Sequence, residues 1–240
     1  MAASLSNTYR RLIDGCLYFN QLMLPQRCLL CTAAAPVRAL CDACHSQSPR
    51  LSGLRYPQCA LPNPQGEICG NCLADPPAFT RVSAAFSYGW PLAPLIRQFK
   101  YAGNLALTGL LADALCSAIR DPVDLVIPMP LGPLRLRERG FNQALELARH
   151  AAAATGTALA AQACRRVIDG APQATLPWRQ RAKNIRGAFV CDADLSGLRV
   201  AVVDDVITTG ATLHELAPTL RKTGAREVHG WMVARTLKQN

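Results

Sequence analysis

The chain has 240 residues, half of them hydrophobic, and a formal net charge of +10 at pH 7. This composition provides for a sizeable buried core and indicates a soluble globular protein rather than a disordered chain. The positive excess is concentrated between residues 128 and 186, where ten basic residues face three acidic ones, and it favours an anionic partner: a nucleic acid, an acidic lipid surface or a phosphate-rich small molecule.

Residues 1–25 predict an amphipathic helix that ends at Pro25 and docks on its own protein. Arg10, Arg11 and Asp14 interrupt its apolar run, so the segment has neither the core of a signal peptide nor the ~20 apolar residues of a membrane span. We therefore expect a cytoplasmic protein without stable membrane insertion. A peripheral position at the inner membrane face stays open.

The cysteines form two sets with the same spacing, displaced by 28 residues. Eleven cysteines in a chain without an export signal favour thiolate–metal chemistry over disulfides. Residues 26–75 therefore predict a double zinc ribbon. The first set is complete and the second has a tyrosine, Tyr56, where its first cysteine should be; the cysteines are Cys28, Cys31, Cys41 and Cys44, then Cys59, Cys69 and Cys72.

The two ribbons differ in what they can bind. Four thiolates on two C-x2-C turns complete a tetrahedral site with no open position, so we expect the first zinc to be structural. The second set has three thiolates, and a tyrosine hydroxyl is a poor zinc ligand beside them. The second ribbon either binds zinc weakly, recruits a fourth ligand such as His45, or has lost the metal and kept its fold.

Residues 80–240 alternate between strand and helix patterns, which predicts an α/β domain with a parallel sheet flanked by helices. In such sheets, binding sites lie at the carboxyl ends of the strands. Strands are expected at 81–88, 124–130, 198–205 and 226–236, and helices at 92–101, 104–120, 141–155 and 212–225.

The stretch "VVDDVITTGAT" places two carboxylates, Asp204 and Asp205, at the end of a buried strand, ahead of a loop and a helix start. Loop amides, hydroxyls and a glycine at a helix start are suited to holding a phosphate. Two carboxylates would repel that phosphate, but they can accept hydrogen bonds from the hydroxyls of a sugar that carries it. The ligand described by these residues is a ribose 5-phosphate.

This stretch resembles the signature of type I phosphoribosyltransferases, which bind phosphoribosyl pyrophosphate (PRPP), usually with Mg²⁺. The resemblance implies that Asp204 and Asp205 are the catalytic acidic pair that contacts the ribose 2- and 3-hydroxyls. It also implies that the 5-phosphate is bound by Thr208, Thr209, Gly210, Ala211 and Thr212.

Pyrophosphate, the leaving group of PRPP, needs cationic partners near another strand end. The segment after "VIPMP" supplies Arg135, Arg137 and Arg139. A second basic segment, "RQRAKNIRG", could fold over the site as a loop and supplies Arg181, Lys183 and Arg186.

Several other polar residues fall inside the predicted elements. Lys100 and Tyr101 could contact a base or a phosphate, although such a pair at a helix end is more often structural. We also expect a structural role for the histidines in helices and strands, which are His150, His214 and His229.

In order, the cysteine ribbons, "FKYAGN", "IPMPLGPLRLRERGFNQA", "RQRAKNIRGAF" and "VVDDVITTGAT" cover nearly the whole chain. Together they resemble the ComF family, also called GntX-like: a double zinc ribbon on a type I phosphoribosyltransferase-like domain. The resemblance implies a role in natural competence, with single-stranded DNA and a DNA-uptake helicase or translocase as partners. It implies structural Zn²⁺ and, with PRPP, Mg²⁺.

The acceptor of a transferred phosphoribosyl group is not indicated by any motif. Two functions therefore stay open. The protein is either a phosphoribosyltransferase with an unknown acceptor, or a DNA- or partner-binding module whose PRPP pocket is not catalytic.

Overall fold

The computed structural model describes residues 27–35, 39–63, 69–168 and 187–237. The chain divides into two compact units, residues 1–48 and 49–240. The helix predicted for residues 1–25 lies outside the described residues. Within the described ranges, each helix is too short or too polar to span a membrane.

The two cysteine ribbons have the same backbone geometry. Each begins with a short antiparallel bridge, Arg27 with Ala34 and Arg55 with Pro62, displaced by the 28 residues of the cysteine repeat. Each then turns through a residue of positive φ and ends in a single-turn helix, so the repeat predicted from the spacing is present in the backbone. The turn residues are Thr32 and Ala60, and the helices are α2 (Asp42–Ser46) and α3 (Gly70–Ala74).

The second unit is built on a five-stranded sheet in the order β1-β7-β6-β2-β3, and all four pairings are parallel. This confirms the predicted fold class. Its strands are β1 (Arg81–Ser87), β2 (Leu125–Pro128), β3 (Ala158–Leu159), β6 (Arg199–Ile207) and β7 (Glu227–Arg235).

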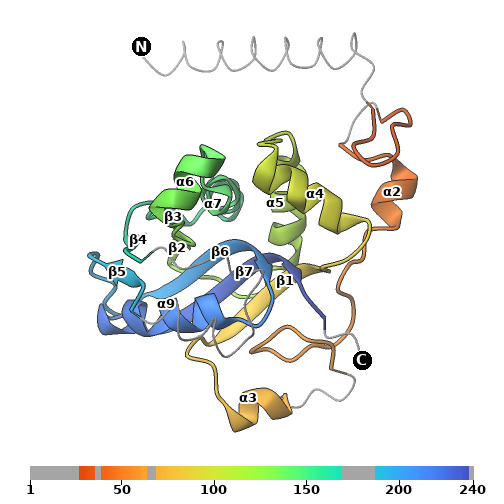
Figure 1. Cartoon of the computed structure of the whole chain (residues 1–240). Helices are drawn as coiled ribbons and strands as arrows, with labels where there is room; N and C mark the ends of the chain where they lie inside the picture. The colour runs from red at the N-terminus through yellow and green to blue at the C-terminus, as the bar shows by residue number, and fades with distance from the viewer. Residues whose placement is uncertain (1–26, 36–38, 64–68, 169–186, 238–240) are drawn as a thin grey trace, which may run out of the picture. The chain divides into compact units, whose positions relative to one another are not determined.

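The central strand β7 consists almost entirely of buried residues and β6 mostly so, because helices cover both faces of the sheet. The helices α4, α5 and α7 lie on one face together with α6, and α9 lies on the other (Figure 1). Their bounds are Leu92–Tyr101 for α4, Leu107–Ala118 for α5, Pro133–Arg139 for α6, Gln143–Thr155 for α7 and Ala211–Lys222 for α9.

Three features of this unit were not predicted from the sequence. The helix α6 forms from the basic run after β2, starting at Pro133 and ending at Gly140 with φ 76°. The strand β3 is only two residues long. A separate antiparallel pair, β4 (Cys164–Arg166) and β5 (Phe189–Cys191), precedes and follows the segment 169–186.

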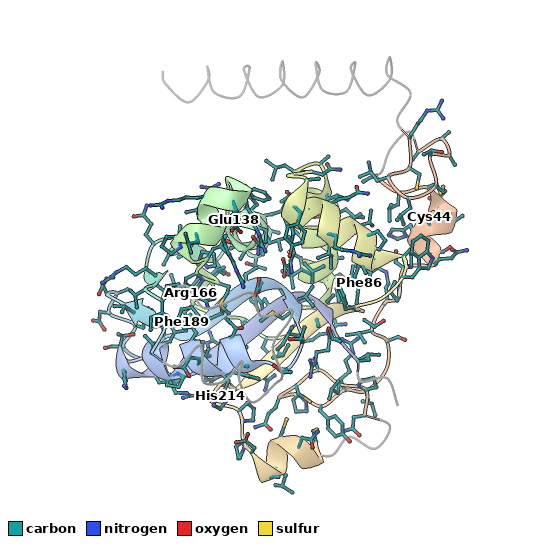
Figure 2. All side chains as sticks on the ribbon, viewed as in Figure 1. Cys44, Phe86, Glu138, Arg166, Phe189 and His214 are labelled. Carbon is teal, nitrogen blue, oxygen red and sulfur yellow. The ribbon has the colours of Figure 1, made fainter. Side chains whose placement is uncertain are left out.

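The β4–β5 pair is reinforced by a cation–π contact. The guanidinium of Arg166 lies 5.7 Å from the ring centroid of Phe189, and the two side chains come from neighbouring strands (Figure 2). Arg181, Lys183 and Arg186 fall between these strands, outside the described residues.

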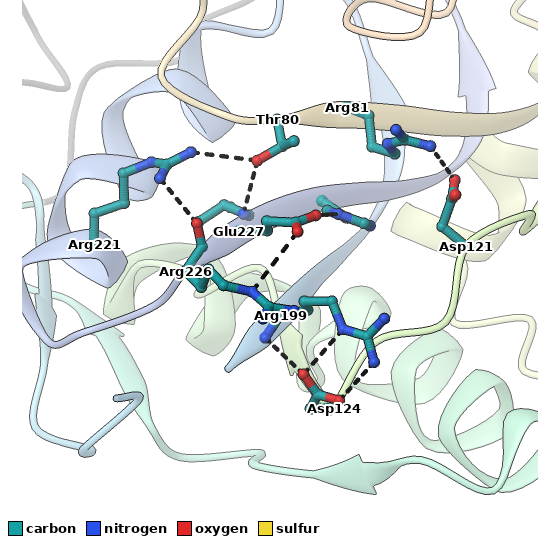
Figure 3. Close-up of polar contacts among 10 residues, drawn as sticks. Thr80, Arg81, Asp121, Asp124, Arg199, Arg221, Arg226 and Glu227 are labelled. Atoms are coloured by element: carbon teal, nitrogen blue, oxygen red, sulfur yellow. Dashed lines mark hydrogen bonds and ion pairs between the residues drawn. The ribbon is translucent and has the colours of Figure 1, made fainter. Parts of the chain in front are cut away.

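Ion pairs and hydrogen bonds close the amino end of the sheet, opposite the predicted site (Figure 3). Arg199 holds Asp124 with two side-chain bonds of 2.9 and 3.1 Å, and the arginine lowers the pKa of that carboxyl well below its ordinary value. Arg221 reaches from α9 to the Thr80 hydroxyl at 3.3 Å. The Arg199–Asp124 pair therefore ties the start of β6 to the start of β2, and Arg221 ties α9 to the start of β1.

The second ribbon packs along the edge strand β1. The amide of Leu51 donates to Ala85 O at 2.9 Å, and the amide of Val82 donates to Pro57 O at 3.0 Å. Arg55 donates to Ala84 O at 2.7 Å. The second ribbon thus belongs to the same compact unit as the sheet.

The helix α9 ends at Lys222 with Thr223 as its C-cap, and the predicted glycine cap, Gly224, is the next residue. This residue has φ 101°, and a Cβ built on it would lie 2.7 Å from the Cα of Ser196. Glycine is required there both for its backbone freedom and for the close approach of another chain segment.

We predict that Gly224→Ala destabilises the protein by about 1–3 kcal/mol, because both the positive φ and the backbone clash must be relieved. Urea unfolding followed by circular dichroism measures the effect. Gly109→Ala is the matched control: Gly109 is in α5 with nothing within 4 Å of an added Cβ, so this change should be neutral or stabilising by up to about 1 kcal/mol. Equal midpoints for the two variants would contradict the prediction.

Candidate functional site

The strand β6 is longer than predicted. It continues to Ile207, so Asp204 and Asp205 lie within the strand rather than at its end. The loop is reduced to Thr208, Thr209 and Gly210, and α9 starts at Ala211. Gly210 has φ 85°, and an added Cβ would lie 3.3 Å from the ring of Phe79. A side chain is thus disfavoured where the loop enters the helix.

An open pocket lies over this loop, with a volume of about 280 Å³ including solvent at its mouth. Because its N-cap is glycine, the amino end of α9 has no N-cap side chain to satisfy its first amides. These amides and the loop hydroxyls can hold an anion. The pocket is lined by Met129, Asp204, Val206, Ile207, Thr208, Gly210, Ala211, Thr212, Leu213 and Met232.

Of the five residues predicted to bind the 5-phosphate, four line this pocket. The fifth, Thr209, is exposed, and its hydroxyl accepts a hydrogen bond of 3.3 Å from the amide of Ala211. The structure therefore brings the predicted phosphate residues together, and their binding of phosphate stays a prediction.

Asp204 and Asp205 point to opposite faces of the sheet, as successive residues of a strand do. Asp204 lines the pocket, and its Oδ1 accepts a hydrogen bond of 2.9 Å from the amide of Asp205. Asp205 is 2% exposed, and its Oδ1 lies 2.9 Å from Nζ of Lys100 on α4. Its other oxygen is buried with no hydrogen-bond partner among the described residues.

This arrangement shifts the pKa values of the acidic pair and its lysine. Burial raises the pKa of Asp204 to about 7, and the adjacent Asp205 adds to the shift while Lys100 opposes it. Burial also disfavours the charge on Lys100, but Asp205 and Asp204 more than offset it and raise its pKa. Lys100 is thus a charged member of the site, which favours the functional alternative that the sequence left open for it over a structural role.

The three predicted arginines of α6 do not share one environment. Arg135 and Arg139 are four residues apart, on one side of the helix, and both are half-buried, whereas Arg137 is exposed. The guanidinium of Arg139 lies 4.9 Å from the ring centroid of Tyr101. Its charge also lowers the pKa of Asp204, so Arg139 is the member of this set that acts on the acidic pair.

The "RERGFNQ" stretch joins α6 to α7. The ring of Phe141 packs edge-on against Phe99 at a centroid distance of 6.0 Å. Asn142 caps α7 by accepting from the amide of Ala144 at 3.0 Å, and its side chain donates to Met129 O at 3.1 Å. These contacts fix α6 against the carboxyl end of β2.

The first cysteine set forms one compact cluster. The sulfurs of Cys28, Cys31, Cys41 and Cys44 lie within 4.8 Å of one another, and those of Cys31 and Cys41 are 3.6 Å apart. A tetrahedral site with Zn–S bonds of about 2.3 Å has sulfurs roughly 3.8 Å apart, so the cluster fits zinc. Burial opposes ionisation of Cys28, but surrounding backbone amides lower the pKa of its thiol to about 6.

The second set brings Cys59, Cys69 and Cys72 within the same 4.8 Å limit. Its backbone turn is complete despite the tyrosine: the amide of Ala60 donates to Tyr56 O at 2.8 Å, as the amide of Thr32 donates to Cys28 O at 2.9 Å. Three thiolates fit a zinc ion that takes its fourth ligand elsewhere. His45 belongs to the other unit and is in neither cysteine cluster.

Sequence reasoning missed Arg235, which is 6% exposed at the end of β7 and donates to the backbone of the phosphate loop. The available signal was a charged residue that ends an apolar strand at the edge where sites are expected. The three histidines have protein partners, as expected: His150 with Asp113, His214 with the amide of Ala78, and His229 with Glu227.

We predict that the full chain retains zinc in its first ribbon and that Cys44→Ser releases it, because one of four thiolates is lost. Elemental analysis of the purified protein measures the zinc content. Cys116→Ser is the control, since Cys116 lies in α5, outside both clusters. An equal zinc content in the two variants would show that the first cluster holds no metal.

Comparison with known proteins supports both parts of the chain. A family model described as a double zinc ribbon domain matches residues 19–73. The DNA utilization protein YhgH of Salmonella typhimurium is 34% identical over 227 residues, which cover 90% of this chain and 100% of the relative. Competence protein F of Haemophilus influenzae is 31% identical, over 87% of this chain and 96% of the relative.

Solved structures give partial overlaps. Glutamine PRPP amidotransferase from B. subtilis, complexed with ADP and GMP, matches 56% of this chain and 30% of its own, at 20% identity and a TM-score of 0.40. Purine phosphoribosyltransferase from Pyrococcus horikoshii matches 55% of this chain and 89% of its own, at 20% identity and a TM-score of 0.32.

Full-length relatives above 30% identity, together with the matching ribbon model, decide the family. The protein is a member of the ComF/GntX-like family, and in its chain a double zinc ribbon precedes an α/β domain with a parallel sheet.

Proposed function

We propose that the protein binds PRPP at the pocket over the loop between β6 and α9. One observation carries the proposal: Asp204 and four of the five phosphate-loop residues line a single pocket at the amino end of a helix. A carboxylate beside a cradle of amides and hydroxyls suits a sugar phosphate better than a free phosphate, which the carboxylate would repel.

Different residues would bind different parts of PRPP. The amino end of α9 and the threonines hold the 5-phosphate, and Asp204 accepts hydrogen bonds from the ribose hydroxyls. Asp205, with one orphaned buried oxygen, becomes available to the sugar or its Mg²⁺ when Lys100 turns to the pyrophosphate. Arg135 and Arg139 supply further positive charge, joined by Arg181, Lys183 and Arg186.

As an enzyme, the protein would break the bond between C1 of the ribose and pyrophosphate and form a bond from C1 to an acceptor. Its own residues would bind the 5-phosphate, orient the sugar and stabilise the departing pyrophosphate. Asp204 and Asp205 would hold Mg²⁺ together with the substrate, and the ion would supply positive charge that offsets the charge of the pyrophosphate.

We place this activity in the handling of DNA during natural competence, in the cytoplasm. The names of the relatives, a DNA utilization protein and a competence protein, support the link to DNA and competence. The chain's positive charge suits single-stranded DNA and an associated helicase or translocase.

A second candidate function is a PRPP-binding module that performs no transfer. The ion pair of Lys100 with Asp205 favours it, because one carboxylate of the pair is occupied in the unliganded protein. Release of pyrophosphate from PRPP in the presence of single-stranded DNA or nucleotides would establish the enzyme. Binding without release for every acceptor would establish the module.

We predict that the zinc-loaded protein binds PRPP with Mg²⁺ in a calorimetric titration, and that Asp204→Asn weakens binding roughly tenfold or more, since hydrogen bonds to a charged group contribute about 1.5–3 kcal/mol. Asp113→Asn is the control, because Asp113 is paired with His150 on the surface of α5 and α7. Absence of heat with wild-type protein would refute the pocket assignment.

We predict that PRPP affinity increases with pH up to about 7 and then levels off. The ionised Asp204 accepts the ribose hydroxyls, and its raised pKa of about 7 means that a proton must leave on binding below that pH. The phosphates of PRPP also titrate near pH 6, so Asp204→Asn serves as the reference. Its pH dependence should be the shallower one, and parallel curves would show that Asp204 takes no part.

A further inference from the structure

Arg235 joins two parts of the second unit that are far apart in the sequence. Its Nε donates to the carbonyl of Cys59, in the second cysteine cluster, at 2.8 Å. Its Nη1 donates to the carbonyls of Ile207, at 3.2 Å, and Thr208. One buried guanidinium therefore contacts the backbone of a metal-type cluster and the backbone of the phosphate loop.

On the loop side, these bonds orient two peptide groups at the start of the loop, and the amide of Thr236 also donates to the carbonyl of Ile207, at 3.0 Å. A peptide group is planar and trans, so its carbonyl and its N–H point in opposite directions. Holding the carbonyls of Ile207 and Thr208 toward Arg235 turns the amides of Thr208 and Thr209 away from it. Arg235 thus fixes two peptide planes of the proposed phosphate cradle.

On the cluster side, the same rule applies to the peptide between Cys59 and Ala60. Its carbonyl accepts from Arg235, while its N–H donates to Tyr56 O at 2.8 Å and closes the turn that presents Cys59. Any change in the position of Cys59 on metal binding or release is transmitted to Arg235, because the guanidinium is buried and rigidly planar.

The second cluster is suited to reversible occupancy. Its three sulfurs lie within bonding reach of one ion, and its turn is complete without a fourth cysteine. A zinc ion held by three thiolates is bound less tightly than one held by four. The backbone bonds to β1 hold the ribbon in place when the ion leaves.

We infer that Arg235 is a positioning residue that couples metal binding at Cys59, Cys69 and Cys72 to the order and ligand affinity of the Thr208–Thr212 loop. Zinc in the second ribbon fixes the loop amides, and its loss loosens them. The ligand part of this inference rests on the proposed binding of PRPP, whereas the loop-order part does not. By linkage, bound PRPP must raise the zinc affinity of the second cluster by the same factor by which zinc raises the affinity for PRPP.

The test compares three variants of the full chain with wild type. Arg235→Met removes the bridge and keeps the length of the side chain. Cys72→Ser removes a thiolate of the cluster and leaves in place the Cys59 carbonyl to which Arg235 donates. Arg55→Met is the matched control, because Arg55 is a half-buried arginine that also ties the second ribbon to the sheet, through Ala84 O, without touching the loop.

The first readout is hydrogen exchange of the loop amides from 208 to 212, which needs no ligand. Arg235→Met and Cys72→Ser should each accelerate this exchange about fivefold or more, the lower end of ordinary coupling between sites. Their combination should add nothing further, since both break one connection. Arg235→Lys, which keeps one donor, should restore part of the protection, and Arg55→Met should leave it unchanged.

The second readout is the equilibrium partition of zinc between the protein and a chromogenic chelator, with and without PRPP. PRPP should strengthen retention of the second zinc in wild type and in Arg55→Met, but not in Arg235→Met. If Arg235→Met does not fold, Cys72→Ser alone decides the loop-order part.

Three results would overturn the inference: no second zinc in wild-type protein, unchanged loop exchange in Cys72→Ser, or equal acceleration in Arg55→Met. Failure of PRPP to bind wild-type protein would refute the proposed function instead and would leave the exchange result to decide the coupling.

Discussion

The parallel pairing of β6 with β7 is the constraint on which the rest of the structure depends. Parallel strands end at one edge, and the register pairs Ile207 with Arg235 at that edge. Asp204 and the phosphate loop therefore share this edge with the guanidinium that reaches the second cysteine cluster. An antiparallel partner in the place of β7 would have put that arginine at the other end of the sheet.

The two edges of the sheet are stabilised differently. At the amino edge, Arg199 and Asp124 form a fully hydrogen-bonded pair, which lowers the pKa of the carboxyl. At the carboxyl edge, Asp204 has a raised pKa and Asp205 has a buried oxygen without a partner among the described residues. Unsatisfied polar groups cost stability. An unpartnered carboxylate oxygen beside a carboxyl group of raised pKa is typical of a functional site.

Much of this architecture could be predicted from the sequence, because its signals are local. Long apolar runs identified β6 and β7, the helical period identified α4 to within its observed bounds, and the 28-residue repeat identified the ribbons. The "TTGAT" stretch identified the loop under the pocket, since the glycine and the hydroxyl residues that form it are consecutive in the sequence.

What could not be predicted depends on contacts between distant segments. Nothing in the sequence distinguishes Lys100 from an ordinary lysine at a helix end. Its role depends on the folding of α4 beside β6, which brings its amino group to Asp205. Arg235 has no local signal for bonding to Cys59, 176 residues earlier in the chain. Nor does cysteine spacing reveal that the second ribbon folds along β1.

The alternation of side chains along β6 has a consequence for any sugar that uses both carboxylates. Such a sugar cannot lie flat against either face of the sheet and must straddle the end of the strand. Its phosphate would then be anchored in the α9 layer, and the carbon that loses pyrophosphate would face the layer of α4 and α6, where Lys100 and Arg139 lie. The 5-phosphate would be bound on one side of the sheet, and the bond from C1 to pyrophosphate would be broken on the other.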